Sequence, residues 1–192
     1  VIRSLAPMLA MDQAALDAAL ARVDEPDFTK AVFRIDFRAN GGPARMEFQS
    51  GDETVEGTLP KWGGEPGTYL MVKGPIGKAW KQYRFTFMPT ASGKVAMLVK
   101  CDTGKLFKPI LVGYDGFTVE GAALANGGFE TLDAGGKPAQ WHAGDAEVKN
   151  GQAQEGQNWV KTSGESGLWQ ELELEAGKPV TLSFYSRIAN DL

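Results

Sequence analysis

Two strand-like runs with the same alternation of apolar and polar residues lie far apart in the chain. The first covers residues 32–40 and the second covers residues 180–187. Every second residue of each run is apolar, which is typical of a β-strand with one buried face. If both runs are the same strand of one β fold, the chain holds the later part of one copy and then the earlier part of the next. The repeat predicts a piece of a modular protein, and such modules usually bind rather than catalyse.

Composition supports a folded chain with many short strands. The 192 residues are 43% hydrophobic, which is enough for one large domain or two small ones. Twenty-four glycines and 10 prolines are many for a helical protein but normal for strands joined by tight turns. The formal charge is −4 and no Lys/Arg cluster stands out, so we expect no nucleic-acid partner. No apolar run approaches the length of a bilayer span, so we expect a soluble chain with no membrane partner.

One amphipathic helix is predicted near the N-terminus, over residues 12–23. Asp12 can cap it, and Met11 and Leu16 can form a hydrophobic staple around its first turn. The helix should end before Pro26. The alternative interpretation of this segment is a linker from a preceding module.

From residue 30 onward the apolar period changes from 3.6 to 2, which predicts strands. Residues 40–43 read as a turn that joins strands 32–40 and 44–48 into a hairpin. Residues 89–93 read as a second turn, through which 94–100 pairs back onto 80–88. The density of strands fits an antiparallel sandwich. The other expected strands cover 69–73, 110–112, 117–119, 146–149, 158–161, 168–174 and 180–185, with one more around Trp141.

Several of these segments resemble the jelly-roll carbohydrate-binding modules of the xylan- and glucan-binding, galactose-binding-like type. Such modules open with Asn-Gly-x-Phe-Glu and place a tryptophan some ten residues later. They continue with Gly-x-x-x-Gln-x-Leu-x-Leu and Gly-Lys-x-Tyr-x-Leu-x-Phe, and they close with a Trp-x-x-Tyr-x-Phe-x-Phe strand and an Asp-containing strand. The similar segments here are 126–130, Trp141, 167–174, 177–184, 80–87 and 114–119. The resemblance implies an all-β fold, an antiparallel jelly-roll β-sandwich, here with one N-terminal amphipathic helix.

The order of these motifs is reversed relative to the family. Residues 1–29 form the helix and linker, residues 30–123 resemble the closing half of a module, and residues 124–192 resemble the opening half. Either the two halves belong to successive modules, or the opening half folds back and completes the same sandwich. The second arrangement leaves fewer bare sheet edges.

Three tryptophans are candidates for sugar binding, because an indole ring can stack on the apolar face of a pyranose. Trp62 lies in a Gly/Pro-rich stretch, and Trp159 and Trp169 alternate out of phase with the expected core positions. The alternative roles are a plug over the sandwich edge for Trp62, and cover by the helix or a neighbouring domain for the other two. Trp80 and Trp141 match positions that are usually packed in the family.

The resemblance also implies a structural calcium ion, held by the signature glutamate and the closing-strand aspartate. These positions are Glu130 and Asp115 here. The alternative is an ordinary pair of turn carboxylates. Catalysis is not expected, because His142 is the only histidine and the chain has no phosphate-binding glycine motif.

These observations predict a non-catalytic carbohydrate-binding or accessory module of a larger polysaccharide-active protein, secreted or at the cell surface. Its expected partners are a polysaccharide or oligosaccharide and neighbouring domains of the same protein. The alternative is a structural spacer or interaction sandwich that binds no sugar, since fold does not imply function.

Overall fold

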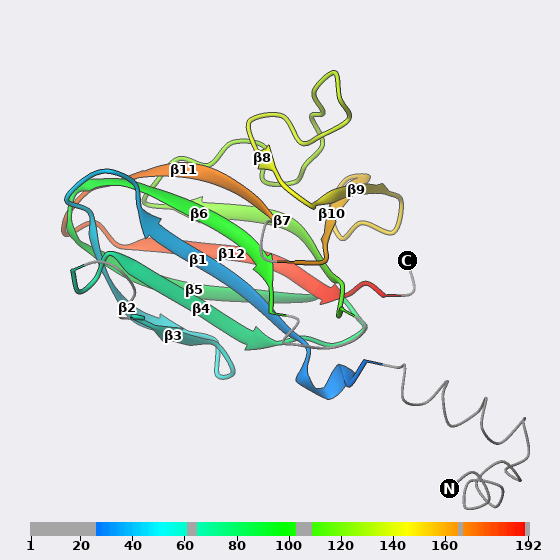
Figure 1. Cartoon of the computed structure of the whole chain (residues 1–192), viewed down its shortest axis with the longest axis horizontal. Helices are drawn as coiled ribbons and strands as arrows, with labels where there is room; N and C mark the ends of the chain where they lie inside the picture. Colours follow the sequence, from blue (N-terminus) through cyan, green and yellow to red (C-terminus); the bar gives the residue numbers. More distant parts are fainter. Residues whose placement is uncertain (1–25, 61–64, 103–108, 165–166, 191–192) are drawn as a thin grey trace, which may run out of the picture.

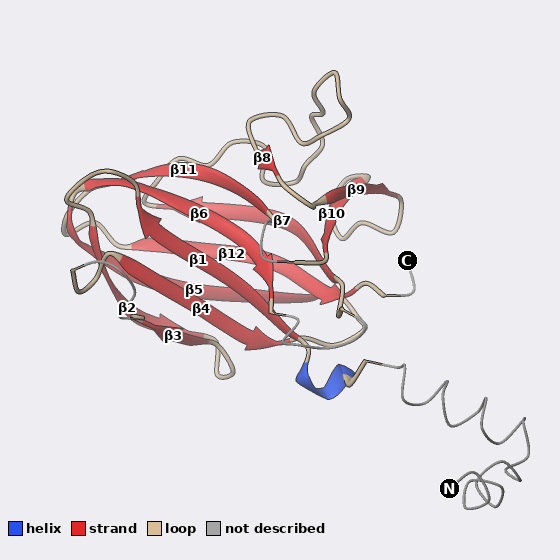
Figure 2. Ribbon diagram, viewed as in Figure 1, coloured by secondary structure: helices blue, strands red, loops and turns tan. Residues whose placement is uncertain are grey.

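The computed structural model describes residues 26–60, 65–102, 109–164 and 167–190. Within these ranges the chain forms one short 3₁₀ helix and twelve strands (Figures 1 and 2). The helix predicted at 12–23 lies outside the described residues, as does Trp62. The described part contains no helical segment with the length and hydrophobicity that spanning a bilayer requires.

The strands have the following bounds. The 3₁₀ helix η3 covers Phe28–Lys30 and precedes β1 (Val32–Ala39), β2 (Arg45–Gly51), β3 (Glu56–Thr58), β4 (Tyr69–Pro75), β5 (Lys81–Ala91), β6 (Gly93–Cys101), β7 (Val112–Glu120), β8 (His142–Ala143), β9 (Glu147–Asn150), β10 (Asn158–Thr162), β11 (Leu168–Leu174) and β12 (Val180–Ile188).

The strands are arranged in two six-stranded antiparallel sheets that face each other across one hydrophobic core. Sheet A has the order β3-β4-β1-β6-β11-β8, and sheet B has the order β2-β5-β12-β7-β10-β9. Figure 2 shows the two layers. The predicted all-β antiparallel sandwich is therefore confirmed.

The last strand joins the two halves of the chain. β12 lies between β5 and β7, with Val180 opposite Phe87 on one side and Leu182 opposite Val119 on the other. In sheet A, β11 pairs over its full length with β6, from Leu168 opposite Val99 to Leu174 opposite Gly93. Both sheets thus combine strands from 30–123 and 124–192, so these segments share one sandwich.

The two similar runs near the ends of the chain are different strands. β1 is central in sheet A and β12 is central in sheet B. They face each other in the core, where the ring centroids of Phe33 and Phe184 are 4.9 Å apart. The expectation that they are the same strand of successive copies was wrong. Their alternation is similar because each strand buries one face in the same core.

Both predicted local pairings were also wrong. β1 pairs with β4 and β6, while β2 pairs with β5 in the other sheet. β5 and β6 likewise lie in different sheets. The long strands β1, β2, β4, β5, β6, β7, β11 and β12 alternate between sheets A and B along the chain. The turns after β1 and β5 therefore carry the chain across the sandwich and do not close hairpins.

Aromatic rings from both sheets fill the centre of the core. Phe184 is fully buried, and its ring centroid lies 5.8 Å from that of Tyr83 and 5.1 Å from that of Phe117. Phe117 in turn packs against Phe129 and Trp141, which come from the segment that follows β7. Burial of Trp141 agrees with its predicted structural role.

Replacing Phe184 by alanine removes a ring that links the two sheets. Because this side chain is fully buried, we expect the free energy of unfolding, measured by urea denaturation, to fall by about 3–5 kcal/mol. Phe48→Ala, which deletes a partly buried ring on β2, is the matched control and should cost clearly less. Equal losses for the two variants would contradict the central position of Phe184.

Candidate functional site

A row of side chains crosses the outer face of sheet A, the face that points away from the core. Asp36 of β1 lies opposite Leu98 of β6, Leu98 lies opposite Trp169 of β11, and Trp169 lies opposite His142 of β8. The rings of Trp169 and His142 stack, with centroids 4.0 Å apart and an interplanar angle of 15°. We call these four residues the sheet A row. It brings an aromatic pair and a charged group onto one surface.

Asp36 is fully buried at one end of the row and is surrounded by donors. Arg34 binds it with two parallel contacts of 2.9 Å, one from Nε to Oδ1 and one from Nη2 to Oδ2. The hydroxyl of Tyr69 donates to Oδ2 at 3.0 Å. Lys100 Nζ and Arg38 Nη2 lie 3.5 Å and 3.3 Å from the same oxygen. One carboxylate thus contacts three cationic side chains and one hydroxyl.

The pKa values of Arg34 and Lys100 are shifted in opposite directions. Burial lowers the pKa of Lys100, and the attraction of Asp36 offsets this only in part. Burial also opposes the charge on Arg34, but its hydrogen bonds with Asp36 raise its pKa above the ordinary value. Asp36 is therefore committed mainly to Arg34, and the Lys100 ammonium is the less well compensated of the two cations.

A hollow of about 340 Å³ lies beside the aromatic pair. Its described lining residues are Leu98, Lys100, His142, Ala143, Gly144, Gly167, Leu168 and Trp169. Only glycine fits at position 167, because a Cβ there would lie 1.8 Å from the carbonyl oxygen of Val99. A backbone this close to β6 keeps the segment before β11 tight against the sheet. The hollow combines apolar rings with one ammonium group, a combination common in small-molecule sites.

Trp159 is placed differently from Trp169. It projects from the outer face of sheet B, but only 2% of it is exposed. Its indole Nε1 donates to the carbonyl oxygen of Gly151 at 2.9 Å, and its ring meets Trp80 edge-on at 5.6 Å. The guanidinium of Arg187 lies over both rings, 4.4 Å from the centroid of Trp80 and 4.9 Å from that of Trp159. These contacts leave Trp159 no free ring face for a sugar.

The loop of residues 151–157, between β9 and β10, is held by the two carboxylates of the expected calcium site. Asp115 Oδ2 accepts the backbone N–H groups of Gln154 and Glu155 at 2.8 and 2.9 Å, and its Oδ1 accepts that of Gly116. Burial raises the pKa of Asp115, and these three hydrogen bonds offset the rise in part. We call this loop the β9–β10 loop.

Glu130 holds the other end of the same loop. Its Oε1 accepts the backbone N–H groups of Gln157 and Asn158, both at 2.9 Å. The backbone also approaches closely at Gly156, where φ is +62° and a Cβ would lie 2.3 Å from Glu130 Oε1. Asp115 and Glu130 therefore hold the same loop at its two ends.

The carboxylates of Asp115 and Glu130, the expected calcium ligands, accept hydrogen bonds from backbone N–H groups. N–H groups approach both oxygens of Asp115 and one oxygen of Glu130, from directions that a cation would otherwise use. Among the described residues, no group of three or more His, Cys, Asp or Glu side chains is placed to hold a metal. These hydrogen bonds clamp the loop at both ends. Calcium stays a prediction, tested by titrating chelator-treated protein with Ca²⁺.

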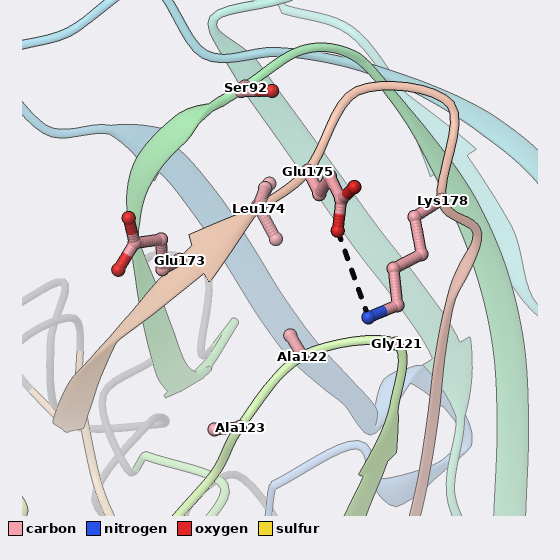
Figure 3. A pocket seen from close by; sticks show the side chains of 8 residues that line it. All are labelled: Ser92, Gly121, Ala122, Ala123, Glu173, Leu174, Glu175 and Lys178. Carbon is pink, nitrogen blue, oxygen red and sulfur yellow. Dashed lines mark ion pairs between the residues drawn. The ribbon is translucent and has the colours of Figure 1, made fainter.

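A second hollow, of about 650 Å³, opens at the end of the sandwich near the β11–β12 turn (Figure 3). Glu175 turns toward Lys178, with 3.9 Å between the paired atoms, while Glu173 points away from both. The described residues that line it are otherwise small or aliphatic, and none is aromatic. It is larger than the hollow beside Trp169 but offers no ring for stacking.

Sequence reasoning located only part of the candidate site. Trp169 was predicted from its alternation with Leu168, and the structure places it on an outer face, as that alternation required. His142 and Lys100 were missed as binding residues. Each is opposite or beside Trp169 only through strand pairing, so the one available signal was the polar position of Lys100 within the alternating run 94–100.

Comparison with known proteins does not identify a family. No protein-family model, curated protein or solved structure matches this chain. The likeness to jelly-roll binding modules therefore depends on the sequence motifs and on the sandwich itself. What the chain does has to be argued from the geometry of its own surfaces.

The clamp on the β9–β10 loop leads to a prediction. In Asp115→Ala the N–H groups of Gly116, Gln154 and Glu155 lose their acceptor, so we expect the free energy of unfolding to fall by about 1–3 kcal/mol. Hydrogen exchange of these amides should accelerate. Glu130→Ala is the matched control and should instead expose the amides of Gln157 and Asn158. Unchanged exchange at both ends of the loop in the two variants would refute the clamp.

Proposed function

We propose that this β-sandwich is a non-catalytic module that binds a saccharide on the outer face of sheet A. The aromatic pair of Trp169 and His142 supplies the surface against which a sugar ring packs. The observation that carries the proposal is the stack of these rings at 4.0 Å beside a hollow of about 340 Å³. Sugar rings present apolar C–H faces that pack on aromatic rings, while their hydroxyls need polar partners at the rim.

The strands that carry the aromatic pair hold both rings in place before a ligand binds. Trp169 and His142 lie on neighbouring antiparallel strands, and each restricts the other's ring orientation. His142 is exposed and β8 is the edge strand of sheet A, so no other strand of the described ranges pairs beyond it. A surface that is ordered before the ligand arrives loses less entropy on binding.

The wider setting follows the motif resemblance. As an accessory module, the chain would hold a polysaccharide or oligosaccharide near an enzyme supplied by another part of a larger secreted or cell-surface protein. Neighbouring domains of that protein are then its second kind of partner.

One observation favours the alternative function, a structural or interaction sandwich without sugar binding. Two of the five tryptophans, Trp141 and Trp159, are buried, so part of the aromatic content stabilises the fold and the β9–β10 loop. The two functions differ in the role of Trp169. In a binding module Trp169 and the exposed His142 contact a ligand, whereas a purely structural sandwich does not require this exposed aromatic pair.

Trp169→Ala tests the proposal. We expect it to weaken binding to soluble polysaccharides by at least about fivefold in affinity gel electrophoresis, since aromatic contacts in binding sites are worth about 1–3 kcal/mol. Trp80→Ala, which removes a partly exposed indole from the other sheet, is the matched control and should bind as the parent does. Thermal melting verifies that both variants fold. Equal binding by parent and Trp169→Ala across a broad glycan panel would contradict the proposal.

A further inference from the structure

On the outer face of sheet A, two buried cations share one carboxylate. Arg34 and Lys100 both contact Asp36, so their two charges together exceed that of the carboxylate by one. The side chains of Arg34 and Lys100 are only 13% and 6% exposed, so water screens this excess less than it would on an open surface. The excess is notable in a chain whose formal charge is −4.

Lys100 is the cation of this pair that lines the hollow beside Trp169. Arg34 instead makes a bidentate contact with Asp36 and a further hydrogen bond to the Tyr69 hydroxyl at 3.0 Å. None of the described lining residues of the hollow carries a carboxylate. Within the described lining, an anion that enters the hollow would therefore meet the cationic side chain of Lys100 and no acidic side chain.

Glu171, the acid that follows Trp169 on the outer face of β11, is paired away from the hollow. Glu171 follows two residues after Trp169 on the same face of β11, but its carboxylate lies 2.7 Å from Lys94 Nζ and accepts a hydrogen bond from Asn40 Nδ2 at 2.9 Å. These contacts direct Glu171 toward the other end of the strand. The hollow thus keeps a cationic end at Lys100 and an aromatic side at Trp169.

The spacing of these two features fits one sugar unit. Leu98, which is opposite Trp169, and Lys100 are two residues apart on β6, a separation of about 7 Å along a strand. A pyranose packed on the aromatic pair carries its substituents a few ångströms from the ring centre, and the flexible lysine stem covers the remainder. A carboxylate on such a ring can reach the Lys100 ammonium while the ring stays on Trp169.

We propose that the saccharide bound on sheet A is acidic, with the carboxylate of a uronic acid unit paired to Lys100 and its ring packed against Trp169 and His142. This inference rests on the proposed function and names its ligand class. The ligand carboxylate supplies the negative charge that the cluster around Asp36 lacks. Because burial already lowers the pKa of Lys100, pairing with an anion also restores the conditions that favour its charged form.

The test compares polygalacturonate with the same polymer after chemical reduction of its carboxyl groups, by isothermal titration calorimetry. We expect the parent protein to bind the acidic polymer at least tenfold more tightly than the reduced one, with an affinity that falls as NaCl is raised. Lys100→Met keeps the length of the stem but removes the charge, and it should lose this preference. Lys100→Arg should keep it. Dextran sulfate is the third probe, and it separates a carboxylated sugar from a sulfated one.

Each outcome is decisive. Equal affinity for the acidic and the reduced polymer, with no effect of Lys100→Met, overturns the acidic ligand but leaves saccharide binding in place if Trp169→Ala still abolishes it. Tight binding of dextran sulfate that survives Trp169→Ala indicates unspecific attraction of polyanions and overturns the inference. Absence of binding to either polymer and to neutral glycans overturns both proposals. If Lys100→Met fails to fold, the salt dependence and polymer preference of the parent protein decide.

Discussion

β12 is inserted between β5 and β7, and the rest of the sandwich depends on this pairing. Without it, sheet B would be split into two parts, each with an unpaired central edge. The same strand carries Phe184 into the middle of the core, where it meets Phe33 from sheet A. One strand therefore completes the hydrogen bonding of one sheet and the packing between both sheets. Residues 30–123 and 124–192 can therefore form one folded unit because β12 pairs with β5 and β7 of the first segment.

The register of sheet A is what assembles the candidate site. Asp36, Leu98, Trp169 and His142 come from four strands that are distant in sequence, and they form one row because each strand is paired in register with the next. A slip of one residue in β11 would turn Trp169 into the core and Leu168 outward. Burial of the alternating apolar residues on the inner face therefore determines which side chains lie on the outer face, where a ligand can contact them.

The alternation of residues located most of the strands but placed their partners poorly. It missed the short β3, and it divided the continuous β7 into two strands, 110–112 and 117–119. β11 was predicted over 168–174 and has those bounds, and the expected strand at 180–185 is the first part of β12. The expected hairpin across residues 40–43 was wrong, since β1 and β2 lie in different sheets. A turn motif and two alternating runs are compatible with a hairpin and equally with a crossing between sheets. The choice depends on which distant strands occupy the neighbouring positions.

The sequence by itself determined where the strands lie and which residues share a face, because the period of two is a local property of extended backbone. Only the tertiary structure decided what those faces meet. Trp159 and Trp169 have the same outward phase, yet the β9–β10 loop and Arg187 cover Trp159, while Trp169 lines a hollow beside Lys100. Likewise, β1 and β12 have similar sequences because they face one core. Accessibility and pairing are set by segments far away in the chain, so no local pattern encodes them.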